Sequence, residues 1–388
     1  MRVDLVDPPA YSPPYDHALA SALARLDDTS VRLLTSAFAY GASPPPNGYE
    51  RDEFFYRHAR GRAGSRLRAF SKRAEHSLDM LRYRRAVAGA GGVAGAGSRA
   101  ADVVHFQWLT VPRLDLRLLP ARPTVLTIHD PLERSSRRGP IPAGAFRGVD
   151  AVIVHSEFAR EQVVAQHGLA PDRIHVIRHG ALGEVTGEKP TVGVGFSPVE
   201  LAGADDGTPV VLSYGLIRPY KGIGTLLEAW RGGAGRGITD AQLWIVGRPM
   251  HESSSLRAAA PAGARLVPRF VTPEEEHALF ERADIIVLPY EKTERFGFSG
   301  VLATALAYGK PIVLSDVGGF AEVTALGAAR GVPPGDPQAL RAALRELIEN
   351  PARRASLAAA AGEAAATVFS WDAAAQATLA LYEKIAGQ

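Results

Sequence analysis

The sequence contains no cysteine among its 388 residues. Disulfide bonds and thiolate metal sites are therefore excluded, and a reducing compartment is favoured. It also lacks an uninterrupted apolar stretch long enough to span a bilayer, and no apolar signal segment precedes the first strand-like run, Val3–Val6. These absences together lead us to expect a soluble, cytoplasmic protein.

The chain lacks a strong overall charge as well, with a formal net charge of +3, but its charges are unevenly spread. Between Glu50 and Arg85 lie eleven cations and five acids. Residues 64–85 suit a helix with Leu67, Phe70, Leu78, Leu81 and Tyr83 partly on one side. Residues 51–85 therefore predict contact with an anionic membrane surface, peripheral at its inner face, rather than with nucleic acid. The alternative is an ordinary solvated helix.

Short, β-rich apolar runs alternate with helical stretches in the first half. The predicted strands are Val3–Val6, Val31–Leu34, Val103–Phe106, Thr124–Ile128, Val152–Val154 and Ile174–Ile177. The clearest helices are Ala18–Leu26 and Phe158–Gln166, the second with Ser156 as its N-cap. Buried strands that alternate with helices indicate a parallel sheet.

The alternation of predicted strands and helices stops after Gly180 and resumes at Val210. The second set of predicted strands is Val210–Leu212, Leu243–Val246, Arg265–Val267, Ile285–Leu288 and Ile312–Leu314. Thr272 and Asp336, each followed by proline, offer N-caps, and Ser370 offers another before the last helix. We expect domains over 1–183 and 209–369, joined by a linker over 184–208. Two such doubly wound units bind ligands at the carboxyl ends of their strands.

Two cations stand where the first strand of the second unit ends. Gly215 would let a ligand approach the backbone, and Arg218 and Lys221 follow on the turn into a helix over Lys221–Trp230. A guanidinium and an ammonium at a strand end suit a diphosphate. A solvated basic turn is the alternative for this stretch alone.

A second anion site is predicted after strand Ile285–Leu288. A glycine-bearing loop leads into a helix that starts near Ser299. The free amides of Phe298, Ser299, Gly300 and Val301 at that helix start would bind phosphate.

Several motifs occur together over nearly the whole chain. They are Asp102–His105, Thr127–Asp130, Asp150–Ser156, Ile174–Gly180, Gly215…Arg218…Lys221-Gly222, Glu294-x-Phe296-Gly297, Ala305-Leu-Ala-x-Gly309-x-Pro311 and Ser315–Glu322. In this order and at these separations they resemble the GT-B retaining glycosyltransferases of the family-4 type.

The resemblance implies two Rossmann-like domains with a cleft between them. The N-terminal domain would face the acceptor, and residues 370–388 would return to it as a helix. The implied activity is transfer of a sugar from a UDP- or GDP-linked donor to a hydroxyl of a glycan, a lipid-linked acceptor or a small molecule, with retention. The resemblance implies neither a cofactor nor a metal ion.

The resemblance also assigns roles to residues. Arg218 and Lys221 would bind the diphosphate, the amides at Phe298–Val301 would bind phosphate and sugar, and His129 would touch the donor sugar. Further donor-binding candidates are Gly215, Gly247, Phe270, Val271 and Glu322, with Phe270 and Val271 framing the base. His129 ends a predicted strand beside Asp130, whereas His105, His155 and His175 read as core residues.

The chain departs from the family pattern at one of two expected glutamates. The family's two glutamates have seven residues between them. Taking Glu294 as the first puts Leu302 at the second place, whereas alignment on Ala305–Gly309 puts Thr304 at the second place and Phe296 at the first. A threonine would hold the ribose by only one weaker hydrogen bond. We expect Glu294 to be the catalytic glutamate that reaches the sugar, with Glu291 as its competitor, and Thr304 to bind the donor.

The second departure follows the first strand, where relatives often carry two glycines. Here Pro8–His17 is rich in proline, and Tyr15, Asp16 and His17 bring side chains to the acceptor side. The alternative is that Asp16 simply caps helix Ala18–Leu26. Trp108 and Asp130 are further acceptor-side candidates, although a core role for Trp108 is equally open.

Two other functions share this architecture. A sugar-nucleotide epimerase would need paired acid and base groups in the cleft, and the sequence does not supply a clear pair. A non-catalytic sugar-nucleotide-binding subunit is suggested by the missing second glutamate. Release of the donor's nucleotide by the purified protein would argue against that subunit.

Overall fold

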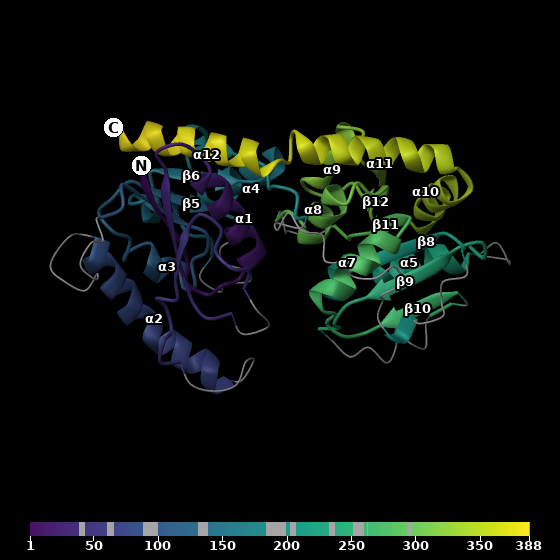
Figure 1. Ribbon diagram of the computed structural model, residues 1–388, viewed down its shortest axis with the longest axis horizontal. Helices are drawn as coiled ribbons and strands as arrows, with labels where there is room; N and C mark the ends of the chain where they lie inside the picture. The colour runs from purple at the N-terminus through teal and green to yellow at the C-terminus, as the bar shows by residue number, and fades with distance from the viewer. Residues whose placement is uncertain are drawn as a thin grey trace. The chain divides into compact units, whose positions relative to one another are not determined.

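The computed structural model describes residues 1–38, 43–59, 66–87, 100–130, 139–183, 199–201, 207–232, 237–250, 260–261, 263–292 and 297–387. The chain forms two compact units, one of Met1–Gly180 with Trp371–Gln388 and one of Ala181–Ser370. Each unit is a parallel sheet with helices on both faces (Figure 1).

The N-terminal unit contains seven parallel strands in the order β3-β2-β1-β4-β5-β6-β7. They are β1 (Arg2–Asp7), β2 (Ser30–Thr35), β3 (Glu50–Asp52), β4 (Val103–Phe106), β5 (Thr124–Thr127), β6 (Ala151–Val154) and β7 (Ile174–Val176). The central strands are buried on both faces, as their continuous apolar runs require. The carboxyl ends of all seven strands therefore lie at one edge of the sheet.

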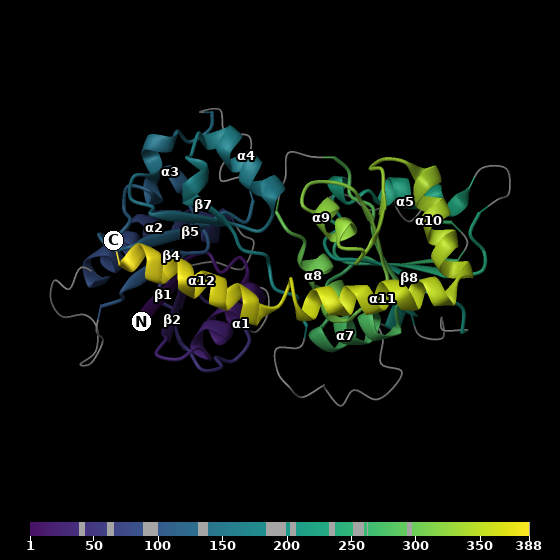
Figure 2. The same cartoon turned by 90° about the horizontal axis from the view of Figure 1, so that it is seen from above.

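Helices cover both faces of this sheet. They are α1 (Pro13–Ala24), α2 (Arg66–Val87), α3 (Pro112–Asp115), α4 (Glu157–His167) and α12 (Trp371–Ala386). Side chains of α1 and α12 pack in one core with Leu5, Val103 and Val125, and the two helices lie side by side in Figure 2. On the other face, Tyr83 of α2 contacts the ring of Phe106 and donates a hydrogen bond to Asp4.

The C-terminal unit contains six parallel strands in the order β10-β9-β8-β11-β12-β13. They are β8 (Val210–Tyr214), β9 (Gln242–Val246), β10 (Ala264–Val267), β11 (Ile285–Leu288), β12 (Ile312–Ser315) and β13 (Arg330–Val332). Its helices are α5 (Ile223–Arg231), α7 (Pro273–Arg282), α8 (Gly300–Ala307), α9 (Phe320–Ala325), α10 (Pro337–Glu349) and α11 (Pro351–Ala366). One core joins the sheet to α5 and α10, and the other joins it to α7, α8 and α9.

The predicted helix starts are confirmed where a capping side chain is present. Ser156 accepts a hydrogen bond from the amide of Ala159, and Thr272 forms a capping box with Glu275. Two strands were not predicted, β3 and β13, and both are three-residue strands at sheet edges. Their charged or glycine-containing sequences lack the apolar run on which strand prediction depends.

The prediction that Asp16 caps a helix over Ala18–Leu26 is wrong. Helix α1 begins at Pro13, so Asp16 lies inside its first turns and is 1% exposed. Proline suits the first helical position, because its φ angle is already helical and its missing N–H would have no partner there. The two prolines therefore extend the helix toward β1.

Part of the predicted linker packs on the C-terminal unit. Residues Val199–Leu201 form a 3-10 turn, and Leu201 is buried in the core beside α7. Glu200 pairs with Arg269 at 2.8 Å. Residues 184–198 and 202–206 lie outside the described residues. Within the described part of the chain, no helix is both long and apolar enough to cross a membrane.

Candidate functional site

A glycine directly follows each of the strands β8 and β9, so the backbone carries no side chain at these two strand ends. Gly215 has φ 101° and Gly247 has φ 148°. A Cβ atom on Gly247 would lie 1.8 Å from the carbonyl oxygen of Gly215, and one on Gly215 would lie 3.0 Å from Val301 of α8. These positions therefore require glycine, and they leave the strand ends open to a ligand.

The cationic turn follows directly. Arg218–Lys221 leads through a 3-10 turn to Gly222, whose φ of 65° starts α5. Lys221 is 9% exposed, and its ammonium lies 4.0 Å from the ring centre of Tyr290 and donates a hydrogen bond to the Tyr290 hydroxyl. Arg218 is partly exposed, and no carboxylate of the described residues forms an ion pair with it. The turn thus holds one anchored and one available cation.

The start of α8 lies beside this lysine. Ser299 is the N-cap residue, but its hydroxyl bonds to the Tyr290 hydroxyl at 2.9 Å instead of capping the helix. Gly215, Lys221 and Tyr290 line one pocket, and the first amides of α8 have no partner within the helix. An anion at this place would meet an ammonium and a helix N-terminus together.

The remaining predicted donor residues lie around these strand ends. The hydroxyl of Thr304, within α8, donates to the carbonyl of Gly300 at 3.0 Å, so a ligand could use it only as an acceptor. Phe270 follows β10, is 54% exposed and lies under the guanidinium of Arg248 at 5.3 Å. Val271 packs against the core, and Glu322 is in the first turn of α9. Glu294, the predicted catalytic glutamate, lies outside the described residues.

Glu291 has a structural partner. Its carboxylate accepts a hydrogen bond of 2.6 Å from the hydroxyl of Thr225, and its amide donates to the carbonyl of Tyr220. Both partners belong to the turn and helix that carry Lys221. Glu291 therefore ties the end of β11 to the cationic turn.

In the N-terminal unit, His129 belongs to a chain of hydrogen bonds at the carboxyl ends of β5 and β6. Nδ1 of His155 lies 2.9 Å from the carbonyl oxygen of Ile177, which only accepts, so Nδ1 carries the proton. Nε2 of His155 then accepts from Nδ1 of His129 at 3.0 Å. Burial lowers the pKa of His155 to about 4 and that of His129 well below its usual value, so both rings are neutral.

Aromatic rings surround these histidines. Tyr15 packs against His129, His179 and Trp371 with ring centres 4.7–5.1 Å apart. Trp108 stacks on His129 at 4.8 Å with an interplanar angle of 17°. The structure thus brings the predicted residues Tyr15, Trp108 and His129 together, and Asp130 follows His129 in a partly buried position.

His105 is the core residue that was predicted. It is fully buried between the hydroxyls of Tyr382 and Thr127, at 2.6 and 2.7 Å. His155 is also buried, at 4% exposure, but its contact with His129 makes it part of the candidate site.

A pair of carboxyl groups lies where β1 ends. Asp7 is 0% and Asp16 1% exposed, and each has one carboxyl oxygen, Oδ1, without a partner among the described residues. The other oxygen of Asp7 accepts from the amide of Tyr11 at 2.8 Å. Burial, followed by the charge of Asp7, raises the pKa of Asp16 well above its usual value. Two buried carboxyl groups whose pKa values are both raised, that of Asp16 the more, are consistent with one shared proton.

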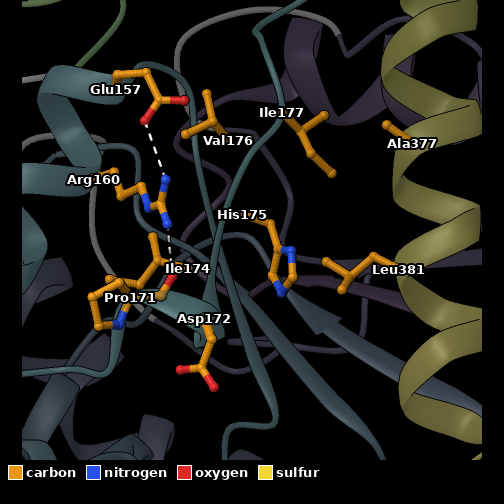
Figure 3. A pocket seen from close by; sticks show the side chains of 10 residues that line it. All are labelled: Glu157, Arg160, Pro171, Asp172, Ile174, His175, Val176, Ile177, Ala377 and Leu381. Atoms are coloured by element: carbon orange, nitrogen blue, oxygen red, sulfur yellow. Dashed lines mark hydrogen bonds and ion pairs between the residues drawn. The ribbon is translucent and has the colours of Figure 1, made fainter.

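A larger pocket of about 440 Å³ lies at the edge strand β7 (Figure 3). It is lined by Arg160 and Glu157 of α4, by His175 of β7 and by Leu381 of α12. Arg160 donates to Glu157 and to the carbonyl of Pro171. None of the predicted site residues lines this pocket.

Sequence reasoning missed Tyr290, Asp7 and the role of His155. Each follows a buried run directly or within two residues, at the end of β11, β1 and β6 respectively. Polar side chains at the carboxyl ends of parallel strands are the signal that would have found them.

Models of two families match the chain. The model described as "Glycosyltransferase Family 4" matches residues 17–181, and the model described as "Glycosyl transferases group 1" matches residues 208–350. The matches thus divide near the boundary between the two compact units.

Relatives match across both units. The chain is 30% identical to an alpha-maltose-1-phosphate synthase of Mycolicibacterium smegmatis over 74% of its own length and 80% of the relative. It is 26% identical to a D-inositol 3-phosphate glycosyltransferase of Kineococcus radiotolerans, over 73% and 71% of the two chains. Anabaena HepE in complex with UDP-glucose has a similar fold, with a TM-score of 0.65, 16% identity, and coverage of 99% and 100%.

Proposed function

This chain belongs to the group 1, family-4 glycosyltransferases, and we propose that it moves a sugar from a UDP- or GDP-linked donor to an acceptor hydroxyl with retention of configuration. Its fold is GT-B, with one doubly wound parallel sheet in each unit. It is a glycosyltransferase. The donor base, the retention, the class of acceptor and the independence from metal ions are parts of the proposal.

The observation that carries this proposal is the cluster Lys221–Tyr290–Ser299 beside the glycine floor of Gly215 and Gly247. It gathers an ammonium, two hydroxyls and the amides at the start of α8 around strand ends that bear no side chain. A diphosphate has the charge and the oxygen acceptors for these groups. We therefore place the donor diphosphate here, with Arg218 as the second cation.

The proposed chemistry depends on charge that develops on the leaving group. As the bond between sugar and diphosphate breaks, the departing nucleoside diphosphate gains negative charge, and preorganised cations and amides stabilise it. The acceptor hydroxyl then bonds to the sugar on the face that the leaving group vacates, and a donor phosphate oxygen takes its proton. Attack on that face gives retention, and no protein base is needed. For the N-terminal unit we propose that His129, held neutral chiefly by burial, contacts the transferred sugar.

A thermal-shift series with UDP- and GDP-sugars tests the donor site. A donor at about 100 times its dissociation constant stabilises the folded protein by about 2.7 kcal/mol. We expect one donor class to raise the melting temperature, and Arg218→Ala to lose most of that rise. The matched control is Arg265→Ala, which removes an exposed arginine of β10. An equal shift in Arg218→Ala and wild-type protein would contradict the proposed diphosphate site.

Helix α2 supports a membrane partner, because its two faces differ. His76, Met80, Tyr83 and Val87 are buried in the N-terminal unit. On the opposite face Leu67, Phe70 and Leu78 are 61%, 73% and 56% exposed, at spacings that place them on one side of the helix. Exposed arginines accompany them, at positions 73, 82, 84 and 85. We propose that this face binds the surface of an anionic bilayer.

Flotation with vesicles of phosphatidylglycerol and phosphatidylcholine tests the membrane proposal. We expect the protein to float with the vesicles at low salt and less so at high salt. The variant Leu67→Ser/Phe70→Ser should bind at least about tenfold more weakly, because two apolar side chains no longer enter the bilayer. The control is Leu326→Ser/Val368→Ser, which alters two exposed apolar residues of the C-terminal unit. No flotation of the wild-type protein at low salt would rule the partner out.

A further inference from the structure

A small pocket, here called the His17 pocket, lies beside the first turns of α1. Its polar lining consists of Asp16, His17, Thr35, Ser43, Tyr49 and Arg51. These residues come from α1, from the carboxyl end of β2 and from the segment that enters β3. The space inside is about 10 Å³, which suits one water-sized group.

His17 presents a buried atom that has no partner. The ring is 2% exposed, and its Nδ1 atom lies 2.9 Å from the hydroxyl of Tyr49. Its Nε2 atom is buried without a hydrogen-bond partner among the described residues. A buried polar atom left without a partner destabilises the folded state, so this atom points to a group that enters from outside the chain.

The polar side chains on the pocket walls differ in charge. Asp16 contributes one wall, and burial, followed by the charge of Asp7, raises the pKa of this carboxyl group well above its usual value, which favours its protonated form. Arg51 contributes a cation, held by the carbonyl of Pro44 at 2.6 Å. Burial, with the nearby charge of Arg51 as a second cause, lowers the pKa of His17, so its ring is neutral. A phosphate would gain from Arg51 but needs more space than the about 10 Å³ inside the pocket.

We infer that the His17 pocket takes one hydroxyl group of a neutral sugar or polyol acceptor, with Nε2 of His17 as a hydrogen-bond partner. A hydroxyl both donates and accepts, so it fits a pocket with a carboxyl group on one wall and a guanidinium on another. This inference rests on the proposed function, because it names the acceptor class of the same enzyme. Asp7 is a positioning residue here, since it reaches the pocket only through Asp16.

Saturation-transfer NMR on the full chain tests the inference. The probes are glucose, mannose, galactose and myo-inositol, together with glucose 6-phosphate and mannose 6-phosphate. We expect transfer to at least one neutral probe, and weaker transfer to its phosphate. His17→Asn keeps a group near Nδ1 for Tyr49 but removes Nε2, and it should weaken the binding roughly three- to tenfold through loss of one hydrogen bond.

The control is His167→Asn. His167 is a 5% exposed histidine of α4 whose Nδ1 lies 2.9 Å from the carbonyl of Ile141, outside the pocket. Its replacement should leave the transfer unchanged. The inference is overturned if no neutral probe receives transfer from the wild-type protein, if His17→Asn binds as the wild type does, or if the phosphates bind more tightly. The donor thermal shift is measured separately, so failure of this pocket is distinguishable from failure of the proposed function.

Discussion

Replacement of Lys221 by methionine is expected to slow sugar transfer by about 100- to 1,000-fold while the C-terminal unit stays folded. Methionine keeps most of the apolar stem of lysine. It removes the charge that we propose faces the leaving diphosphate, together with the hydrogen bond to Tyr290. The ammonium of Lys221 is held in advance by Tyr290, over whose ring it lies at 4.0 Å, so it needs no rearrangement during the reaction. Release of nucleoside diphosphate from the donor selected by thermal shift measures the rate.

Lys310→Met is the matched control. Lys310 is a partly buried lysine of the same unit, and it donates to the carbonyl of Glu281 away from the glycine floor. Its replacement should change the rate by less than about threefold, since no charge near the diphosphate is lost. A rate for Lys221→Met within a few-fold of the wild type would remove this lysine from the proposed mechanism.

Asp16→Asn is expected to make the protein more stable than the wild type at neutral and alkaline pH. The pKa of Asp16 is raised well above 3.8, chiefly by burial and next by the charge of Asp7. The folded state therefore binds a proton that the unfolded state releases at lower pH. As pH rises from about 3.8 to the raised pKa, the wild type loses about 1.4 kcal/mol of unfolding free energy per pH unit.

Asparagine imitates the protonated acid, because its NH₂ group can donate to the free oxygen of Asp7 at every pH. The titratable hydroxyls that interact with the pair are those of Tyr15, Tyr49 and Tyr56, and these stay neutral over the range. The side chain of Ser12 and the amides of residues 10–12 also contact the pair, and none of them titrates. Urea unfolding between pH 4.5 and 8.5, followed by tryptophan fluorescence, measures the difference. We expect the gap between variant and wild type to widen as pH rises and then to level off.

Asp372→Asn provides the comparison for this titration. Asp372 lies in α12 of the same unit, and its side chain is 73% exposed in an ion pair with Arg25. Such an exposed pair contributes little, so that variant should follow the wild type at every pH. A parallel course for Asp16→Asn and wild-type protein would show that the acid pair does not share a proton.

Much of the fold was predictable, because parallel strands that are buried on both faces appear in the sequence as continuous apolar runs. Val103–Phe106 and Ile285–Leu288 have the predicted bounds, and the turn with Arg218 and Lys221 lies at a strand end as predicted. These features depend on residues that are neighbours in the chain, so local pattern is enough to find them.

The contacts that complete the sites could not be predicted in the same way. Lys221 meets Tyr290 only because β8 and β11 are adjacent in the sheet, although 69 residues separate the two side chains. The pair of Asp7 and Asp16 depends on where α1 begins, and the two prolines moved that start away from the predicted position. Strand order and helix register are set by packing of the whole unit, which short patterns do not contain.

The glycine floor also restricts how the proposed donor site could come to accept a different donor. A Cβ atom at Gly247 would collide with the chain itself, so no side chain can be introduced there to read a new base or sugar. A change in donor preference must instead come from the loops that follow β9 and β10. Arg248 and Phe270 are exposed there and can vary without disturbing the strands. Directed evolution of donor choice should therefore leave the floor untouched and accumulate its changes at these loop positions.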